Sequence, residues 1–146
     1  MTISYDDVVN AQKTQDSVIR KTSLTFSDTF TKITGSTVYL KNEFEQKTGS
    51  FKLRGAYYKI KTLSEEEKRN GVVAASAGNH AQGVAFASAL EKIKCVIVMP
   101  KNASPAKVAA TKAYGATVVL AGKNYDESWI KAQGIAKTTG ATIIHA

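Results

Sequence analysis

The sequence has one cysteine, two prolines and no long apolar run. The single cysteine, Cys95, excludes an intramolecular disulfide, and its place before the apolar run 96–99 indicates a buried thiol in a reducing compartment. No apolar stretch approaches the roughly 18 residues that a membrane span requires. The N-terminus also lacks the basic region and apolar core of a signal peptide. We therefore expect a soluble cytoplasmic protein with no membrane partner.

Acidic residues and arginines are scarce relative to lysine. Seventeen lysines and three arginines against 12 acidic residues give a formal net charge of +8. The lysines are spread along the chain without a block of like charge, and aromatic residues are not interleaved with arginines as on a nucleic-acid-stacking surface. This pattern favours a solvated lysine surface over nucleic-acid binding, and it also suits a small anionic ligand.

The N-terminal half contains separate helix signals rather than one regular pattern. The length of 146 residues and the 43% hydrophobic share are typical of one globular domain. Ser4, Ser27 and Ser64 are placed to cap helices, and Gly35 is placed to end the second of these. The run 37–40 is rich in β-forming residues, so we expect a strand there.

A further helix is predicted directly after the polar stretch 43–49. Leu53, Ala56, Tyr57 and Ile60 follow the i, i+3, i+4, i+7 spacing of a helix with one buried face. Ser50 is the candidate cap of this helix.

From residue 71 onward short apolar runs alternate with helical segments. The runs begin near residues 72, 95, 117 and 142. The segments between them carry cap signals, namely Ser104 with Pro105, Asn124 with Glu127, and Gly140. Strands alternating with helices of this length give right-handed crossovers and a parallel sheet. We predict a three-layer α/β fold, in which the last strand normally leads into another helix, so the chain is expected to be part of something larger.

The segment SAGNHAQG, at residues 76–83, directly follows the predicted strand at 72–75. It would lie at the carboxyl end of a parallel strand and open a helix, where ligands bind in open α/β sheets. Small residues let backbone N–H groups approach a ligand, and a helix N-terminus favours an anion. Gly78 and Gly83 are not spaced as in the dinucleotide fingerprint. The alternative is a tight strand-to-helix turn without a ligand.

The segment SFKLRGA, at residues 50–56, places Lys52 near a helix start and beside an aromatic ring. A lysine in such a place can act as an amine nucleophile. Position alone does not establish that role, because Lys52 is one of 17 lysines and a solvated helix lysine is the alternative.

Together, the two segments resemble the double signature of the threonine/serine dehydratases, which are pyridoxal-phosphate enzymes with the tryptophan-synthase-β-like fold. The runs 38–41 and 96–100 are also similar to this family, so that the resemblance covers nearly the whole chain. One departure is Ser23, which follows Thr22 where the family usually has proline. The departure touches no residue to which the resemblance gives a role.

The resemblance implies a role for each matching residue. Lys52 would form the aldimine with pyridoxal 5'-phosphate and later remove the proton from the substrate Cα. Phe51 would pack against the pyridine ring of the cofactor, and Asn79 would hydrogen-bond its ring oxygen. The substrate carboxylate would be held by four residues, Ser76, Gly78, Asn79 and His80. No metal site is expected.

The implied reaction is the elimination of water from L-threonine or L-serine, which gives a 2-oxo acid and ammonia. In serine-racemase relatives the position of Ala77 carries a serine that acts as a second base, so alanine favours elimination over racemisation. The cysteine-synthase branch is less similar, because it typically has threonine where His80 stands. Full-length family members are commonly homo-oligomers, so the same is expected here.

The resemblance covers only the N-terminal portion of the catalytic fold. Residues 1–70 would be the opening elements of the large domain with the lysine helix, and residues 71–146 a small α/β domain. The family holds the cofactor phosphate with a glycine-rich loop in its C-terminal half, whereas all ten glycines here are isolated. The alternatives are therefore a dehydratase represented by part of its chain, an inactive fragment that binds the cofactor poorly, and a racemase or β-replacement relative. The isolated chain is expected to be inactive.

Overall fold

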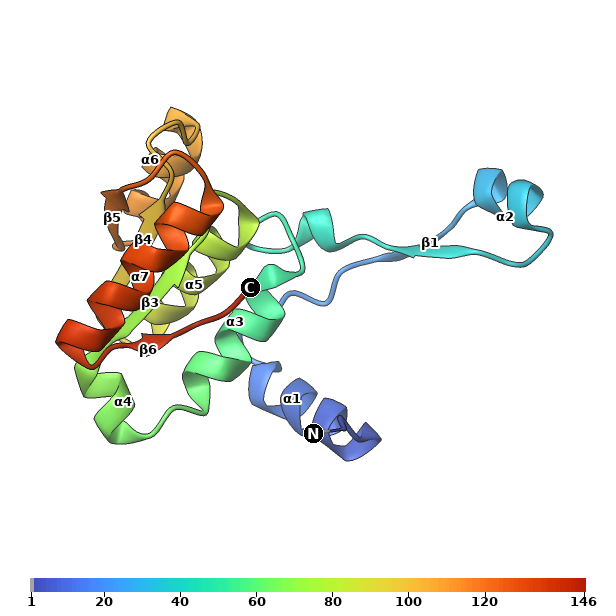
Figure 1. The fold of residues 1–146 in the computed structure, drawn as a ribbon. Helices are drawn as coiled ribbons and strands as arrows, with labels where there is room; N and C mark the ends of the chain where they lie inside the picture. Colours follow the sequence, from blue (N-terminus) through green and yellow to red (C-terminus); the bar gives the residue numbers. More distant parts are fainter. Residues whose placement is uncertain (1) are drawn as a thin grey trace.

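A four-stranded parallel sheet forms the centre of the computed structural model, which describes residues 2–146. The strands are β3 (Val72–Ala75), β4 (Cys95–Met99), β5 (Thr117–Leu120) and β6 (Thr142–Ile143). Their order is β5-β4-β3-β6, and each neighbouring pair is parallel (Figure 1). All four strands begin where the sequence predicts them, and the α/β class with a parallel sheet is confirmed.

Helices cover both faces of this sheet. They are α5 (Asn79–Leu90), α6 (Pro105–Ala113) and α7 (Tyr125–Thr139), and each joins two successive strands. Side chains alternate along β3, so that Val72 and Ala74 pack with α5 while Val73 and Ala75 pack with Ala132 of α7. The result is the predicted three-layer arrangement of helix, sheet and helix.

Helix α3 (Lys52–Lys61) shares the core of the sheet although it precedes the sheet in the sequence. Its predicted apolar face is confirmed, because Leu53, Ala56, Tyr57 and Ile60 are all buried. This face packs against α5, and α4 (Glu65–Asn70) then leads into β3. The division of the chain at residue 70 stays a prediction, and α3 packs across it.

The segment before α3 forms an arm that projects from the body (Figure 1). The arm consists of β1 (Leu24–Phe26), α2 (Asp28–Thr34) and β2 (Tyr39–Lys41), with the two strands antiparallel. The strand predicted at 37–40 is found two residues later, and β1 was not predicted. Large apolar side chains of the arm are exposed, namely Leu24, Phe26, Phe30, Ile33, Tyr39 and Leu40.

The remaining N-terminal elements are α1 (Tyr5–Gln15), which contacts α3, and the short 3-10 helix η1 (Glu43–Glu45). Within residues 2–146 no helix is both long and apolar enough to cross a membrane.

Side-chain caps form at most of the predicted helix starts. The capping residues are Ser4, Ser27, Ser64 and Asn124, each of which accepts a hydrogen bond from a backbone N–H three residues later. The prediction for Ser50 was wrong by one position, because Phe51 is the N-cap of α3 and the Ser50 hydroxyl reaches only Lys52 N, at 3.4 Å. Ser104 precedes Pro105 as predicted but makes no side-chain cap bond.

Candidate active site

The turn between β3 and α5 is held by one side chain. Ser76 Oγ accepts hydrogen bonds from Gly78 N at 3.2 Å and from Ala81 N at 3.3 Å. Ser76 N itself donates to Val98 O, which ties the turn to the neighbouring strand. The turn therefore lies at the carboxyl edge of the parallel sheet with a fixed backbone, as the sequence predicts for residues 76–83.

The N-terminus of α5 presents free backbone donors. Two of the donors near this end, Gly78 N and Ala81 N, are taken by Ser76. The N–H groups of Asn79 and His80 have no acceptor in the part of the chain that the structure describes. The first turn of α5 contains no acidic residue that would compensate the positive end of the helix dipole. This end is therefore suited to an anion such as a carboxylate.

The His80 side chain makes a structural hydrogen bond and is not one of the free donors at the start of α5. Its ring is buried, and Nε2 lies 3.0 Å from Ile144 O on the segment after β6. Because a carbonyl can only accept, Nε2 carries the proton, which leaves Nδ1 without one in the neutral ring. Burial lowers the pKa of His80 below its ordinary value, and the nearby positive charge of Lys52 lowers it further. Only the backbone N–H of His80 is available for the carboxylate role that the sequence suggests.

Lys52 is the first residue of α3 and is half-buried. Its Nζ lies 5.5 Å from the centroid of the Phe51 ring, which is itself largely exposed. The backbone of Lys52 packs directly on α5, because a Cβ on Gly83 would lie 3.2 Å from the Lys52 carbonyl carbon and oxygen. The structure thus brings the two sequence segments together, with the start of α3 beside the first two turns of α5.

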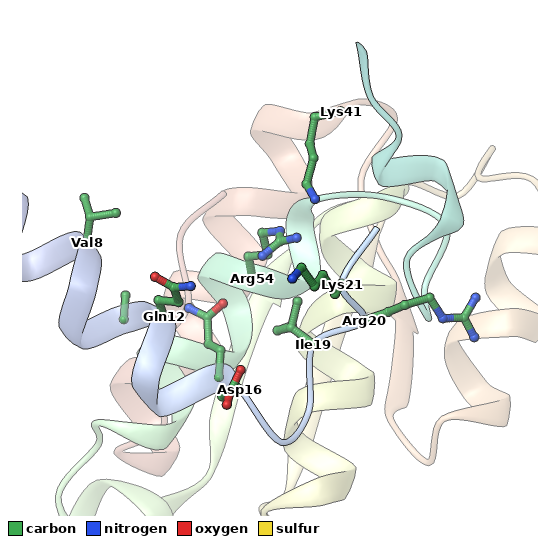
Figure 2. Close-up of a pocket in the computed structure, with 10 residues that line it drawn as sticks. Val8, Gln12, Asp16, Ile19, Arg20, Lys21, Lys41 and Arg54 are labelled. Atoms are coloured by element: carbon green, nitrogen blue, oxygen red, sulfur yellow. The ribbon is translucent and has the colours of Figure 1, made fainter. Parts of the chain in front are cut away.

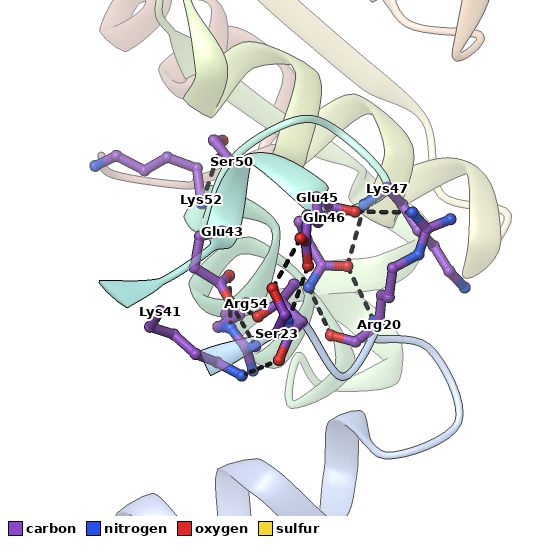
Figure 3. Close-up of polar contacts among 11 residues, drawn as sticks. Arg20, Ser23, Lys41, Glu43, Glu45, Gln46, Lys47, Ser50, Lys52 and Arg54 are labelled. Carbon is purple, nitrogen blue, oxygen red and sulfur yellow. Dashed lines mark hydrogen bonds and ion pairs between the residues drawn. The ribbon is translucent and has the colours of Figure 1, made fainter. Parts of the chain in front are cut away.

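A partly buried polar network supports the segment that leads to Lys52 (Figure 3). Arg54 donates two hydrogen bonds to the Glu43 carboxylate, at 2.8 and 2.7 Å, and Thr22 Oγ1 donates a third at 2.7 Å. Hydrogen bonding to Arg54 is the main reason why the pKa of Glu43 falls to about 2. The Gln46 side chain is buried and bonds both Arg20 N and Arg20 O. The network has no local signal in the sequence, because its partners lie up to 26 residues apart.

One cavity lies away from this turn (Figure 2). It has a volume of about 550 Å³ and lies between α1, the segment 16–21 and two cationic side chains, Lys41 and Arg54. None of the residues at the start of α5 lines it. No group of three or more histidine, cysteine, aspartate or glutamate residues within 2–146 is arranged to hold a metal ion.

Comparison with known proteins agrees with this geometry. A sequence profile for a family described as pyridoxal-phosphate dependent enzyme matches residues 16–146. The chain is 49% identical to an L-threonine ammonia-lyase of Thermotoga maritima over 143 residues, which covers 98% of this chain and 36% of that protein. It is 47% identical over 144 residues to an L-threonine dehydratase, catabolic TdcB, of Staphylococcus aureus (strain USA300), which covers 98% of this chain and 42% of that protein.

Solved structures give the same result. The fold is similar to that of serine racemase from Dictyostelium discoideum, with a TM-score of 0.90, 35% identity, and coverage of 99% of this chain and 47% of that one. It is also similar to the processed form of threonine deaminase isoform 2 from Solanum lycopersicum, with a TM-score of 0.85, 35% identity, and coverage of 99% and 41%. The chain therefore spans less than half the length of each of these relatives.

Proposed function

The chain belongs to the family of pyridoxal-phosphate dependent enzymes, and we propose that it supplies the lysine and the carboxylate-binding part of a threonine/serine ammonia-lyase. The reaction would convert L-threonine or L-serine to a 2-oxo acid and ammonia. The single observation that carries the proposal is the contact between Lys52 at the start of α3 and the α5 turn around Gly83, one helix turn after Asn79. The contact involves the backbone of Lys52, and the charge of the Lys52 side chain acts on His80 at the start of α5, which supports an amine near an anion-binding helix start.

The residues present fit part of the cofactor. Lys52 is half-buried as a residue, the neighbouring Phe51 ring is exposed and free to pack on a flat heterocycle, and Asn79 is the first residue of α5. When bound, pyridoxal phosphate withdraws electrons from the substrate Cα and so makes its proton removable. A loop for the phosphate group has no candidate here, because no two glycines of the sequence are adjacent. We expect that group to be held by protein outside these 146 residues.

The chain's own residues would perform three tasks. The free N–H groups of Asn79 and His80 would orient the substrate carboxylate. Lys52 Nζ, in its neutral form, would accept the proton from Cα as the general base. Ser76 would keep the N–H groups in place through its two hydrogen bonds to the turn. Preorganised donors of this kind avoid the cost of ordering them when substrate binds.

Ala77 favours elimination over racemisation as the outcome. It follows Ser76 in the turn, is partly buried, and has only a methyl group, which cannot transfer a proton. Racemisation requires a second base on the opposite face of Cα, and the matching position of serine racemases carries a serine. Similarity to a serine racemase structure therefore supports the fold, while Ala77 supports the lyase.

Reductive trapping tests the placement of Lys52. The chain would be mixed with pyridoxal phosphate, reduced with borohydride and mapped by mass spectrometry. We expect Lys52 to be labelled in preference to the other lysines, and Lys52→Ala to abolish the preferred site while Lys59→Ala, an exposed position on the same helix, leaves it intact. Labelling spread evenly over the surface lysines would contradict the proposal.

Activity is tested separately. We expect the isolated chain to release no 2-oxobutanoate from L-threonine in a coupled assay, because these 146 residues contain no candidate for a glycine-rich phosphate loop. A protein of the relatives' length that contains this chain should release it, and the same protein with Lys52→Ala should not. Chiral analysis after incubation with L-serine distinguishes elimination from racemisation.

We also propose a cytoplasmic location and a homo-oligomeric assembly for the longer protein. The location is supported by the single buried thiol, whose pKa burial raises to about 11. The assembly is supported by the exposed apolar side chains of the arm, such as Phe26 and Tyr39, which pack edge to face on each other and remain about half exposed.

A further inference from the structure

A second lysine reaches the turn at the start of α5. Lys107 lies in the first turns of α6, which packs beside α5. Its Nζ lies 3.9 Å from the position that a Cβ on Gly78 would occupy. The side chain is exposed, and none of the ion pairs found within residues 2–146 involves it. The Lys107 ammonium group therefore lies near Gly78, the N-cap of α5, and is not paired with a carboxylate of the described residues.

This arrangement gathers positive charge around an open donor set. The N-terminus of α5 is the positive end of the helix dipole, and its first turn has no acidic residue. The charge of Lys52 is close enough to lower the pKa of His80 at the same end of the helix. An ammonium group in such a place is unfavourable by itself and becomes favourable when an anion lies between it and the helix N–H groups.

We infer that Lys107 is a substrate-binding residue whose ammonium group pairs with the substrate carboxylate held at the start of α5. The inference rests on the proposed function, because it names a further contact of the same site. The His80 ring is buried and already bonds Ile144 O. The positive charge that would neutralise the substrate carboxylate therefore comes from a side chain of another element. Lys107 supplies that charge from α6, beside Gly78, the residue that directly precedes the free N–H groups of Asn79 and His80.

The test is an NMR titration of the ¹⁵N-labelled 146-residue chain with sodium acetate at constant ionic strength. We expect saturable shifts of the Asn79 and His80 amide signals. Lys107→Met should weaken the binding about two- to fivefold, the range expected for loss of one exposed charge pair. Lys107→Arg should bind acetate nearly as well as the original chain. Lys112→Met, an exposed lysine on the same helix, is the matched control and should bind it unchanged.

Two outcomes would overturn the inference. One is equal acetate affinity of Lys107→Met and the original chain, and the other is the absence of any shift at Asn79 and His80. The affinity of Lys107→Met should also depend less on salt, which a merely structural role would not change. Reductive trapping at Lys52 separates the two proposals. If Lys52 is labelled in Lys107→Met as in the original chain, a failure in the acetate titration concerns Lys107 alone.

Discussion

Gly83 of α5 lies against the backbone of Lys52 at the start of α3. A Cβ at position 83 would lie 3.2 Å from the carbonyl carbon and oxygen of Lys52 and from Leu53 N. Such distances are shorter than normal side-chain contacts, and the neighbouring atoms are backbone atoms that cannot rotate away. Glycine therefore lets the two helices approach closely (Figure 1), and this approach fixes the position of the Lys52 backbone beside α5.

Substituting this glycine tests the contact. Gly83→Ala should destabilise the fold by about 1–2 kcal/mol, because overpacking outweighs the gain of about 1 kcal/mol in helix propensity. It should also move α3, so that labelling of Lys52 by pyridoxal phosphate and borohydride falls. The measurements are urea unfolding and mass-spectrometric mapping.

Gly134→Ala provides the matched control. Gly134 lies within α7, and a Cβ there would meet nothing within 4 Å. The control should therefore stabilise the protein by about 0.5–1 kcal/mol and leave the labelling of Lys52 unchanged. Equal effects of the two substitutions on stability would show that the contact with Lys52 does not exclude a side chain at position 83.

The buried His80 ring should make stability depend on pH. Burial lowers the pKa of His80 in the folded chain below its ordinary value of 6.5, so that the unfolded chain binds the proton more readily. Stability should be constant above about pH 6.5 and fall as the pH decreases below it, by at most about 1.4 kcal/mol per pH unit for one proton.

His80→Asn should remove this dependence between pH 6.5 and 5, measured by urea unfolding at each pH. The variant should also be less stable at neutral pH, because the packing of the imidazole and its bond to Ile144 O are altered. An unchanged slope in the variant would assign the pH dependence to other groups.

Local signals in the sequence were sufficient for most of the body of the fold. The spacing of Leu53, Ala56, Tyr57 and Ile60 predicts a buried helix face because helical periodicity is a property of neighbouring residues, and all four are buried. The strands of the parallel sheet could be found in the same way, since a strand buried on both faces is a continuous apolar run. The arm was less predictable, because the three-residue strand β1 is exposed and has no such pattern.

The candidate site was only partly predictable, because several of its contacts join residues far apart in the sequence. The Glu43–Arg54 pair and the bonds of Gln46 to Arg20 have no local signature. The approach of Lys107 to Gly78 depends on how α6 lies beside α5, which no spacing along the chain specifies. His80 was assigned by resemblance, whereas its ring is directed to Ile144 by the position of β6.

Ser76 should be needed for the shape of the turn. Ser76→Ala removes the acceptor of both Gly78 N and Ala81 N, and comparable losses of helix caps cost about 1–2 kcal/mol. We expect this loss in urea unfolding, together with faster hydrogen exchange of the Ala81 amide. Ser76→Thr, which keeps the hydroxyl group, should retain most of the protection. Equal exchange rates in Ser76→Ala and the original chain would exclude the bond to Ala81 as a support of the turn.

The Glu43–Arg54 pair should stabilise the chain at neutral pH and lose its effect in acid. Its hydrogen bonds hold the pKa of Glu43 at about 2, below the ordinary 4.5, so that the contribution is complete above about pH 4.5 and declines toward pH 2. Glu43→Gln should cost about 1–2 kcal/mol at pH 7, less than a fully buried charged bond because the Arg54 side chain is 37% exposed. The difference between variant and original chain should shrink as the pH falls from 4.5. Glu65→Gln is the control, since loss of its surface pair with Lys68 should not measurably change the free energy of unfolding. A loss of stability in Glu43→Gln no larger than in this control would contradict the role of the network.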